Sequence, residues 1–442
     1  MMNYRMRAHF AKATRLVLLC AAISCCTSSL GRADLVLPRG YQLGIEEDLG
    51  VVVRMLQERK LDQARTRLDE IKLRNRELPH REVMLAELLI KAALPVDGRR
   101  VLEALAAAEP NRFDVLFLLC RLAVDEQRWF EALSHAQAAE KLALPDEWDM
   151  GYKQAAQSDL YLLKGMCYDG RSEWQAAITA YQASLQVESK GNIRATIGLG
   201  CALFHNSQPT EALEQFRRLR EIDPRADLPE TTMAALYDQQ GDAVEAENWF
   251  RMAIALQVPG AEPARLKFAR WLIWNNRPAE VASILSHKPS SPEAERERQF
   301  LAAMVARMES RNADAQRLLS TLHQLDPTSF AISNHLALVL IENSDEATRA
   351  RAQQIAEANV RNNQTSAEAW ATLGWIQLKL GDLAFAEQSL QMSCRSGVIS
   401  RDTAHYLATL QDIKGQTQTA AGIRNSLAEA SGPFFYSAPH TP

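Results

Sequence analysis

The feature that most constrains this chain is a pattern of small and bulky residues that returns about every 34 positions. Eleven frames share it, beginning near residues 45, 79, 113, 158, 193, 227, 262, 296, 330, 367 and 401. Most successive spacings are 34 or 35 residues, and the two longer ones are 45 and 37. The longer spacings indicate insertions around 144–154 and 342–348. A regular period of this length predicts a repeat array.

Two columns of small residues carry the argument for paired helices. The eighth position of each frame is Val52, Ala86, Cys120, Gly165, Gly200, Ala234, Ala269, Ala303, Ala337, Gly374 and Ala408. The twentieth position is Ala64, Gly98, Ala132, Ala177, Ala212, Ala246, Val281, Ala315, Ala352, Ala386 and Ala420. Bulky residues such as Leu68, Tyr181 and Phe216 follow four positions later. Small side chains at these positions let two antiparallel helices approach closely, and the bulky residues fill the space between repeats.

These patterns predict an all-α fold, a solenoid of antiparallel helix pairs. The chain is also rich in Ala, Leu, Glu, Gln and Arg, which favour helix. Pro110, Pro224 and Pro327 are expected to end three second helices. One repeat cannot bury its apolar face alone, so the repeats must stack and the last one needs a polar cap, for which Arg424 is suited. We expect a leader at 1–33, a lead-in at 34–44, the array at 45–432 and a tail at 433–442.

The frames resemble the tetratricopeptide repeat (TPR), whose period is 34. The 367 frame matches best, with Trp370, Leu373, Gly374 and Ala386, while Pro278 in the 262 frame departs from the pattern. The resemblance covers about 45–432. It implies a right-handed superhelix that binds a protein or peptide partner in its concave groove, and it names no partner.

In such repeats the first helix of each pair lines the groove. The candidate partner-binding residues are Arg121, Arg270, Trp274, Met304, Met308, Trp375 and Lys379, with Met166 and Leu338 beside them. Six of the seven form i, i+4 pairs, and Trp, Met and Arg often dominate binding surfaces. Packing between neighbouring repeats is the alternative role for each.

Two further segments have two interpretations each. The inserted segment 144–156 contains Trp148 and Tyr152 among polar residues, and it is either a plain connecting loop or a second binding surface. The tail contains Phe434, Phe435 and Tyr436 after a helix-breaking Gly-Pro. It either docks back onto the final helix or presents a short aromatic motif to a partner.

Charge and motifs exclude several classes of function. The chain carries 50 basic and 54 acidic residues, so it lacks the basic excess typical of nucleic-acid binders. It has no phosphate loop, no HExxH, no GxSxG and no EF-hand loop, and its histidines and cysteines lack metal-ligand spacing. We therefore expect no enzyme activity, no cofactor, no metal and no small-molecule substrate. Cys120, Cys167, Cys201 and Cys394 are expected to fill core positions, although a Cys167–Cys201 disulfide stays open.

The first 33 residues have the composition of an export signal. Five basic residues and no acidic residue accompany the apolar run 16–23, which is too short to span a membrane. Gly31 and Ala33 suit a cut before Asp34, and residues 22–25 loosely resemble a lipoprotein cleavage site at Cys25. An accidental apolar start on an intracellular protein is the third interpretation.

The sequence thus predicts an exported, periplasmic or secreted, non-catalytic scaffold that binds a protein or peptide. The alternative is an envelope assembly factor for secretion, pilus or outer-membrane machinery, attached to the membrane only through a lipid on Cys25. An intracellular regulatory scaffold is the remaining hypothesis. The mature amino terminus distinguishes the three, because it would be Asp34, acylated Cys25 or Met1 respectively.

Overall fold

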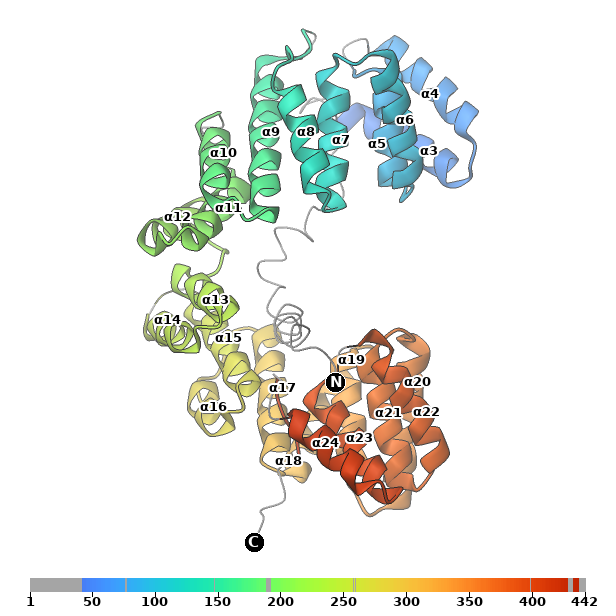
Figure 1. Ribbon diagram of the computed structural model, residues 1–442, viewed down its shortest axis with the longest axis vertical. Coiled ribbons are helices and arrows are strands. Elements are labelled where there is room, and N and C mark those ends of the chain that lie inside the picture. Colours follow the sequence, from blue (N-terminus) through green and yellow to red (C-terminus); the bar gives the residue numbers. More distant parts are fainter. Residues whose placement is uncertain are drawn as a thin grey trace. The chain divides into compact units, whose positions relative to one another are not determined.

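A computed structural model describes residues 42–75, 78–146, 148–187, 192–256, 258, 260–397, 399–427 and 432–436. Within these residues the regular elements are 22 α-helices and one short 3-10 helix. They form eleven consecutive pairs, each with a first and a second helix (Figure 1). The predicted all-α solenoid of antiparallel helix pairs is confirmed. The predicted leader, 1–33, lies outside the described residues.

The described chain falls into two compact units that divide between Pro229 and Glu230. The amino-terminal unit holds five helix pairs. They are α3 (Gln42–Gln57) with α4 (Leu61–Arg74), α5 (Arg81–Lys91) with α6 (Pro95–Ala108), α7 (Phe113–Asp125) with α8 (Trp129–Ala139), α9 (Met150–Gly170) with α10 (Trp174–Val187), and α11 (Ile193–His205) with α12 (Pro209–Ile222).

The carboxy-terminal unit holds six helix pairs and the described part of the tail. The pairs are α13 (Pro229–Gln240) with α14 (Ala243–Ala255), α15 (Ala261–Trp274) with α16 (Pro278–Leu285), α17 (Pro292–Met308) with α18 (Asn312–Leu325), α19 (Phe330–Leu340) with α20 (Glu346–Asn362), α21 (Ala367–Leu380) with α22 (Leu383–Ser393), and α23 (Arg401–Ile413) with α24 (Thr417–Leu427). The 3-10 helix η1 (Cys394–Ser396) follows α22. One continuous core runs from Ala234 to Leu410.

Both predicted columns of small residues are buried at every position. The bulky partners Leu68 and Phe216 are also buried, at 0% and 1% exposed. Because the small positions have so little side chain, the second helix of each pair can lie close to the first. The two columns therefore act as the helix contacts that the sequence predicted.

A left-handed residue makes the turn inside most helix pairs. It is Gly241, Gly381 or Gly415 in three of them and a non-glycine residue in seven others, among them Ser207, Asn276 and Ser310. The next residue's backbone N–H then bonds back into the first helix, as from Gln208 to the Leu203 carbonyl at 2.9 Å. This is the Schellman arrangement, which satisfies the carbonyl groups at a helix end.

Several helices begin at a residue whose side chain caps the first turn. Ser291, Asp345, Ser366 and Ser400 each accept a hydrogen bond from the backbone N–H three residues later. Such caps satisfy donors that the first helical turn leaves unpaired. The predicted stops are confirmed too, since α6, α12 and α18 each end two residues before Pro110, Pro224 and Pro327 respectively.

The inserted segment 144–156 differs from both interpretations made from its sequence. Helix α9 begins at Met150, so the second half of the segment is an added two turns of a first helix. Trp148 and Tyr152 are buried, at 3% and 9% exposed, and their rings lie 4.3 Å apart with Trp148 also against Phe113. Two aromatic side chains gain more by leaving water than by facing it. The predicted second binding surface at these residues was wrong.

Tyr181 shows how tightly neighbouring pairs pack in the amino-terminal unit. Its ring, on α10, lies between Gly165 of α9 and Gly198 of α11, and a Cβ atom built on these glycines would lie 2.4 Å and 2.5 Å from it. The phenol donates a hydrogen bond to Asp169 Oδ2 at 2.6 Å. Burial raises the pKa of Asp169 to about 7, against the lowering effect of that hydrogen bond.

Candidate functional site

The tail lies across the first helices of the carboxy-terminal unit. Residues 432–436 form neither helix nor strand, and they contact the end of α15 together with α17, α19, α21 and α23. We call the residues beneath them the tail seat. The tail seat consists of Asn276, Arg307, His335, Trp375, Asp402, His405 and Tyr406. The tail docks back onto the array as the first interpretation predicted, but on first helices rather than on the final helix. Its role as an aromatic motif for a partner stays a prediction.

The backbone of the tail is held by side chains at both ends of the seat. Asn276 Nδ2 donates to the Gly432 carbonyl at 3.0 Å, and its Oδ1 accepts from the Phe434 N–H at 2.8 Å. Asp402 Oδ1 accepts from the Phe435 N–H at 3.3 Å. An asparagine that both donates to and accepts from one strand of backbone fixes its register without regard to its side chains.

The rings of the tail pack on aromatic and charged groups. The Arg307 guanidinium lies 4.3 Å from the centroid of the Phe435 ring, within range of a cation–π interaction. Tyr436 stacks on His405 at 4.8 Å and lies edge-on to Trp375 at 5.3 Å. These ring contacts bury apolar surface and give the seat a preference for aromatic residues.

Beneath the tail rings lies a second layer. Trp375 stacks on Tyr406 at 4.5 Å, and the Tyr406 hydroxyl lies 3.0 Å from that of Tyr436. Tyr406 is 1% exposed, and burial raises its pKa well above the ordinary value. The pKa of Tyr436 rises too, to a value above the usual range, chiefly through burial. Both phenols therefore stay neutral and can share one hydrogen bond.

Four ionisable residues on successive first helices form a cluster beside the tail, in which Arg307 is buried, His335 and Asp402 are half-buried and Glu368 is exposed. They are Arg307 on α17, His335 on α19, Glu368 on α21 and Asp402 on α23. Arg307 is 5% exposed and contacts His335 Nδ1. Burial, and then the Arg307 charge, hold the pKa of His335 well below its ordinary value, so the ring is neutral and accepts from arginine.

The two carboxyl groups of this cluster, those of Asp402 and Glu368, have raised pKa values. Burial raises the pKa of Asp402 to about 6, and the Arg307 charge and the Phe435 N–H bond act against it. Partial desolvation by the surrounding helices raises the pKa of Glu368 as well, and its carboxylate accepts from Asn334 Nδ2 at 3.0 Å. A cluster of ionisable groups that is partly buried and partly exposed is typical of a binding surface rather than of a packing core.

The predicted partner-binding residues of this unit fall into two groups. Met304 and Trp375 are buried, at 3% and 4% exposed, as is the neighbouring Leu338, so these three pack inside the fold. Met308 is half-buried against the core. Their exposure was overestimated because a first helix of this array buries more than one stripe of its surface.

Three predicted residues remain accessible there. Arg270 lies on the surface and pairs with Glu297 of the next first helix at 2.6 Å. Lys379 pairs with Glu342 at 2.9 Å. Trp274 is half-buried, and a Cβ atom on Gly432 would lie 3.5 Å from its ring. Lys379 also lies 5.4 Å from the Trp375 ring, so it is beside the tail seat. Trp274 lies at the edge of the seat, and Arg270 lies one helical turn before Trp274 on α15.

In the amino-terminal unit the predicted residue Arg121 has a local partner. It pairs with Glu87 across α7 and α5 at 3.2 Å, with the two side chains 14% and 3% exposed. An ion pair this far from water joins two first helices, and removing one partner would strand the other charge. Met166 of α9 is half-buried and packs on the core of this unit.

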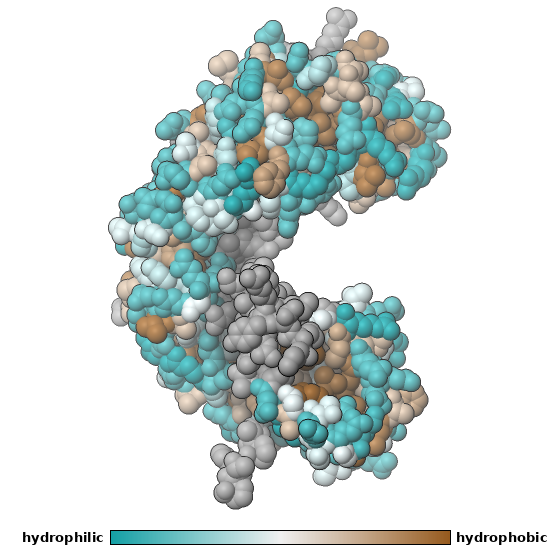
Figure 2. Space-filling model, viewed as in Figure 1, coloured by the Kyte–Doolittle hydropathy of each residue, from teal (hydrophilic) through white to brown (hydrophobic). Residues whose placement is uncertain are grey.

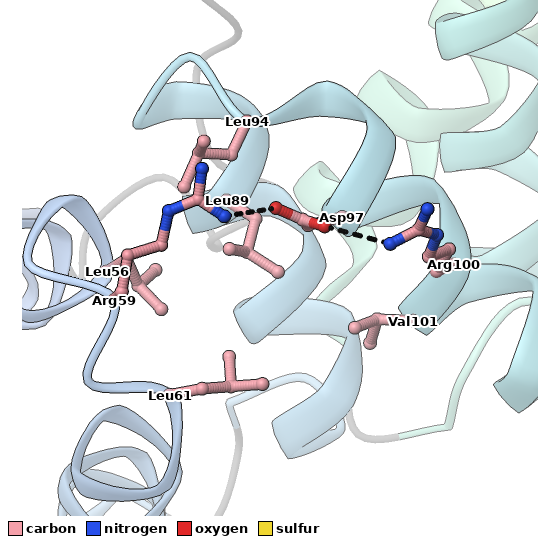
Figure 3. A pocket seen from close by; sticks show the side chains of 8 residues that line it. All are labelled: Leu56, Arg59, Leu61, Leu89, Leu94, Asp97, Arg100 and Val101. Carbon is pink, nitrogen blue, oxygen red and sulfur yellow. Dashed lines mark hydrogen bonds and ion pairs between the residues drawn. The ribbon is translucent and has the colours of Figure 1, made fainter.

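A pocket of about 380 Å³ also lies in the amino-terminal unit, between its first two helix pairs (Figure 3). Five apolar side chains line it: Leu56, Leu61, Leu89, Leu94 and Val101. Asp97 lies between Arg59 and Arg100, at 3.6 Å and 3.4 Å. The charges of this pocket are thus paired with each other, and none of the predicted site residues lines it.

The structure also bears on metal binding, membrane insertion and disulfide bonding. In the part of the chain that the structure describes, no three His, Cys, Asp or Glu side chains group as metal ligands, and no helix has the length and apolar character to cross a membrane. The four cysteines within those residues are free thiols, with no Cys167–Cys201 disulfide. Cys120 lies beside Cys167, and that contact together with burial raises the pKa of the Cys120 thiol. The surface seen in Figure 2 is mostly hydrophilic, with scattered apolar patches on both units.

Sequence reasoning missed Asn276, Arg307, Glu368 and Asp402. Asn276 gave one signal, because it follows Asn275 at a helix-ending turn where several other repeats place Ser or Gly. Glu368 and Asp402 share the second position of their first helices, where a carboxylate also suits the helix dipole. Arg307 and Asp402 contact the tail, and no periodicity within the array could predict where a non-repeating tail docks.

No protein-family model and no curated protein sequence matches the chain. Solved structures with similar helices include MamA, at 18% identity over 38% of this chain and 92% of that chain, with a TM-score of 0.32. YrrB, described as a TPR protein with an unusual peptide-binding site, is 16% identical over 43% of this chain and 92% of that chain, with a TM-score of 0.34. A tetratricopeptide repeat protein from Parabacteroides merdae is 15% identical over 70% of this chain and 98% of that chain, with a TM-score of 0.32.

The chain's own helices carry the assignment of the fold. Eleven helix pairs recur with a period near 34 residues, and both columns of small residues are buried throughout. The chain therefore has the fold of a tetratricopeptide repeat protein.

Proposed function

We propose that this protein is a non-catalytic scaffold that binds an extended segment of another protein on the first helices of its carboxy-terminal unit. One observation carries the proposal. The tail seat already holds five non-helical residues through three side-chain contacts to backbone groups and through stacked rings. A surface that holds one non-helical segment in this way has the chemistry to hold another.

The residues around the seat support the same proposal. Lys379 beside the seat and Arg270 one turn from Trp274 are accessible cations, each paired with a glutamate. Trp274 and the buried Arg307 offer the aromatic and guanidinium groups that are common at interface hot spots. Aromatic and arginine contacts at the centre with ion pairs at the rim are the usual anatomy of a protein interface.

The test is partner capture by full-length protein from its own host after cross-linking. Arg270→Glu and Lys379→Glu reverse charges near the seat, and we expect each to reduce capture several-fold. The matched control is Arg317→Glu, on second helix α18, whose side chain is 71% exposed. Trp375 is unsuitable for this test because it is buried. Equal capture by all three variants would refute the proposed binding face.

We also propose that the scaffold is exported, on the basis of the basic and apolar pattern of residues 1–33. The captured sample tests this directly, because mass spectrometry reads the amino terminus of the bait. An amino terminus at Asp34 is the expected result. Acylated Cys25 would favour the lipid-anchored assembly factor, and an intact Met1 would refute export.

A further inference from the structure

We propose that the tail is a built-in competitor for the partner, and that the partner's segment is an extended peptide with consecutive aromatic residues like those of the tail. This inference rests on the proposed function and deepens it. The tail then does two things in one place. The tail covers the binding surface in the free protein. Its side chains also resemble those of the partner segment that would displace it.

The contacts between the seat and the tail are of two kinds. Some can be made by a peptide of any sequence, and the others depend on the peptide's side chains. On the tail's side, three hydrogen bonds involve backbone atoms only: Asn276 donates to the Gly432 carbonyl, the Phe434 N–H donates to Asn276, and the Phe435 N–H donates to Asp402. A different sequence can therefore occupy the same track. Selection comes from the ring positions, because these alone contact side chains of the peptide.

Two ring positions are distinct in their chemistry. The first, at Phe435, lies between the Arg307 guanidinium at 4.3 Å and the His335 ring at 5.3 Å. An electron-rich ring without a charge fits there, whereas a lysine would face Arg307. The second, at Tyr436, offers the Tyr406 hydroxyl at 3.0 Å, so it favours a phenol over a plain phenyl ring.

The manner of attachment argues that the tail can leave. Four residues, 428–431, separate α24 from Gly432, and all the tail contacts named above involve side chains of the seat. A tethered segment competes at an effective concentration of about 1 mM. If the free peptide binds the empty seat at about 10–100 µM, the closed tail weakens its apparent affinity about 10- to 100-fold.

The experiment measures binding of a fluorescent peptide with the sequence of residues 431–439, Ser-Gly-Pro-Phe-Phe-Tyr-Ser-Ala-Pro, to full-length proteins by anisotropy. An open variant carries Phe435→Ala and Tyr436→Ala in its own tail and leaves the seat intact. We expect the open variant to bind the peptide at least 10-fold more tightly than the wild type. A peptide with alanine at both ring positions should bind neither protein.

The seat itself is tested within the open variant by Asn276→Gly. Asn276 has a φ of 57°, which glycine adopts freely, so this change removes the amide without straining the turn. We expect peptide affinity to fall about 10-fold or more for the two lost hydrogen bonds. Ser310→Gly is the matched control, since Ser310 occupies the same turn position after α17, also at φ 57°. It should leave peptide binding unchanged.

Hydrogen exchange on the wild-type protein covers the case in which the open variant folds poorly. The Phe434 and Phe435 amides donate to the seat, so they should exchange slowly in the free protein and faster when unlabelled peptide is added. Exchange at 432–436 that saturating peptide does not change would overturn the proposal. So would a folded open variant that binds the peptide no better than the wild type.

Two other results are informative. A concentration-dependent dimer of the wild type, absent in the open variant by light scattering, would overturn the proposal in favour of the tail of a second copy as the occupant. Partner capture that depends on Arg270 and Lys379 but is identical in the open variant would overturn the competitor role and leave the proposed function standing. Loss of that dependence would refute the proposed function itself, whatever the peptide does.

Discussion

Replacing Gly165 by alanine should destabilise the amino-terminal unit, although alanine is the better helix former. The added Cβ would lie 2.4 Å from Tyr181 Cε1, and ordinary contact between carbon atoms begins near 3.4 Å. The ring must therefore move by about 1 Å in a close-packed core. It has little freedom to do so, because Gly198 lies on its other side and Asp169 holds its hydroxyl at 2.6 Å.

The expected magnitude comes from two opposing effects. Overpacking a core by one methyl group costs about 1–3 kcal/mol, and disturbing the phenol hydrogen bond adds about 1 kcal/mol. Gaining alanine inside a helix returns about 1 kcal/mol. We expect Gly165→Ala to lower the free energy of unfolding by about 1–3 kcal/mol.

Gly50 offers a matched control in the same unit. It lies inside α3, it is exposed, and no atom outside its own helix lies within 4 Å of an added Cβ. Gly50→Ala should therefore raise the free energy of unfolding by about 0.5–1 kcal/mol through helix propensity alone. The same chemical change is thus expected to have opposite signs at two helical positions.

Urea denaturation followed by circular dichroism would measure both variants, with hydrogen exchange at α9–α11 because repeat arrays need not unfold in one step. Tyr181→Leu in the Gly165→Ala background should recover part of the loss, with a coupling energy of at least about 1 kcal/mol. The reasoning fails if Gly165→Ala and Gly50→Ala change stability in the same direction by similar amounts.

Three other predictions follow from single sites. Ser207→Gly should stabilise the protein by about 0.5–1 kcal/mol, because Ser207 holds a φ of 62° that glycine adopts without strain; a lower urea midpoint would contradict this. Asp169 has a folded pKa of about 7, above its unfolded value, so its contribution is fully present below about pH 4 and is lost as pH rises through 7. Between pH 5 and 8 the wild type should therefore lose about 2 kcal/mol more stability than Asp169→Asn, and parallel pH profiles would refute the assignment. Cys120 and Cys167 should resist a thiol reagent until urea unfolds the protein, because both are 0% exposed, and rapid labelling of the native protein would disprove their burial.

The helix pairs of the array could be predicted closely because the residues that form their contacts recur at a fixed spacing in the sequence. Each small residue at the eighth or twentieth position repeats the same helix contact, so one missing match, such as Val281, does not shift the frame. Helix ends were equally predictable, since Pro224 or Gly381 acts on its neighbours in the chain. The inserted helical turns of α9 were missed because Trp148 and Tyr152 have no counterpart in other repeats.

The candidate site was predicted only in part for a related reason. Arg270 and Lys379 were recognised because they project from a repeating stripe. Arg307 and Asp402 became important through the tail, a segment that no repeat predicts and that reaches them from beyond the last helix pair. Contacts between a repeating and a non-repeating segment leave no period in a sequence.

The contact between Asn276 and the tail joins residues 156 and 158 positions apart, in a unit whose helices otherwise meet their near neighbours. An array of neighbour contacts alone can peel from its free end, one pair at a time. Here the last pair cannot peel until the tail has released a turn that lies four pairs earlier. The tail therefore acts as a latch: pulled from its carboxyl end, this unit should resist until one rupture event and then extend in smaller steps.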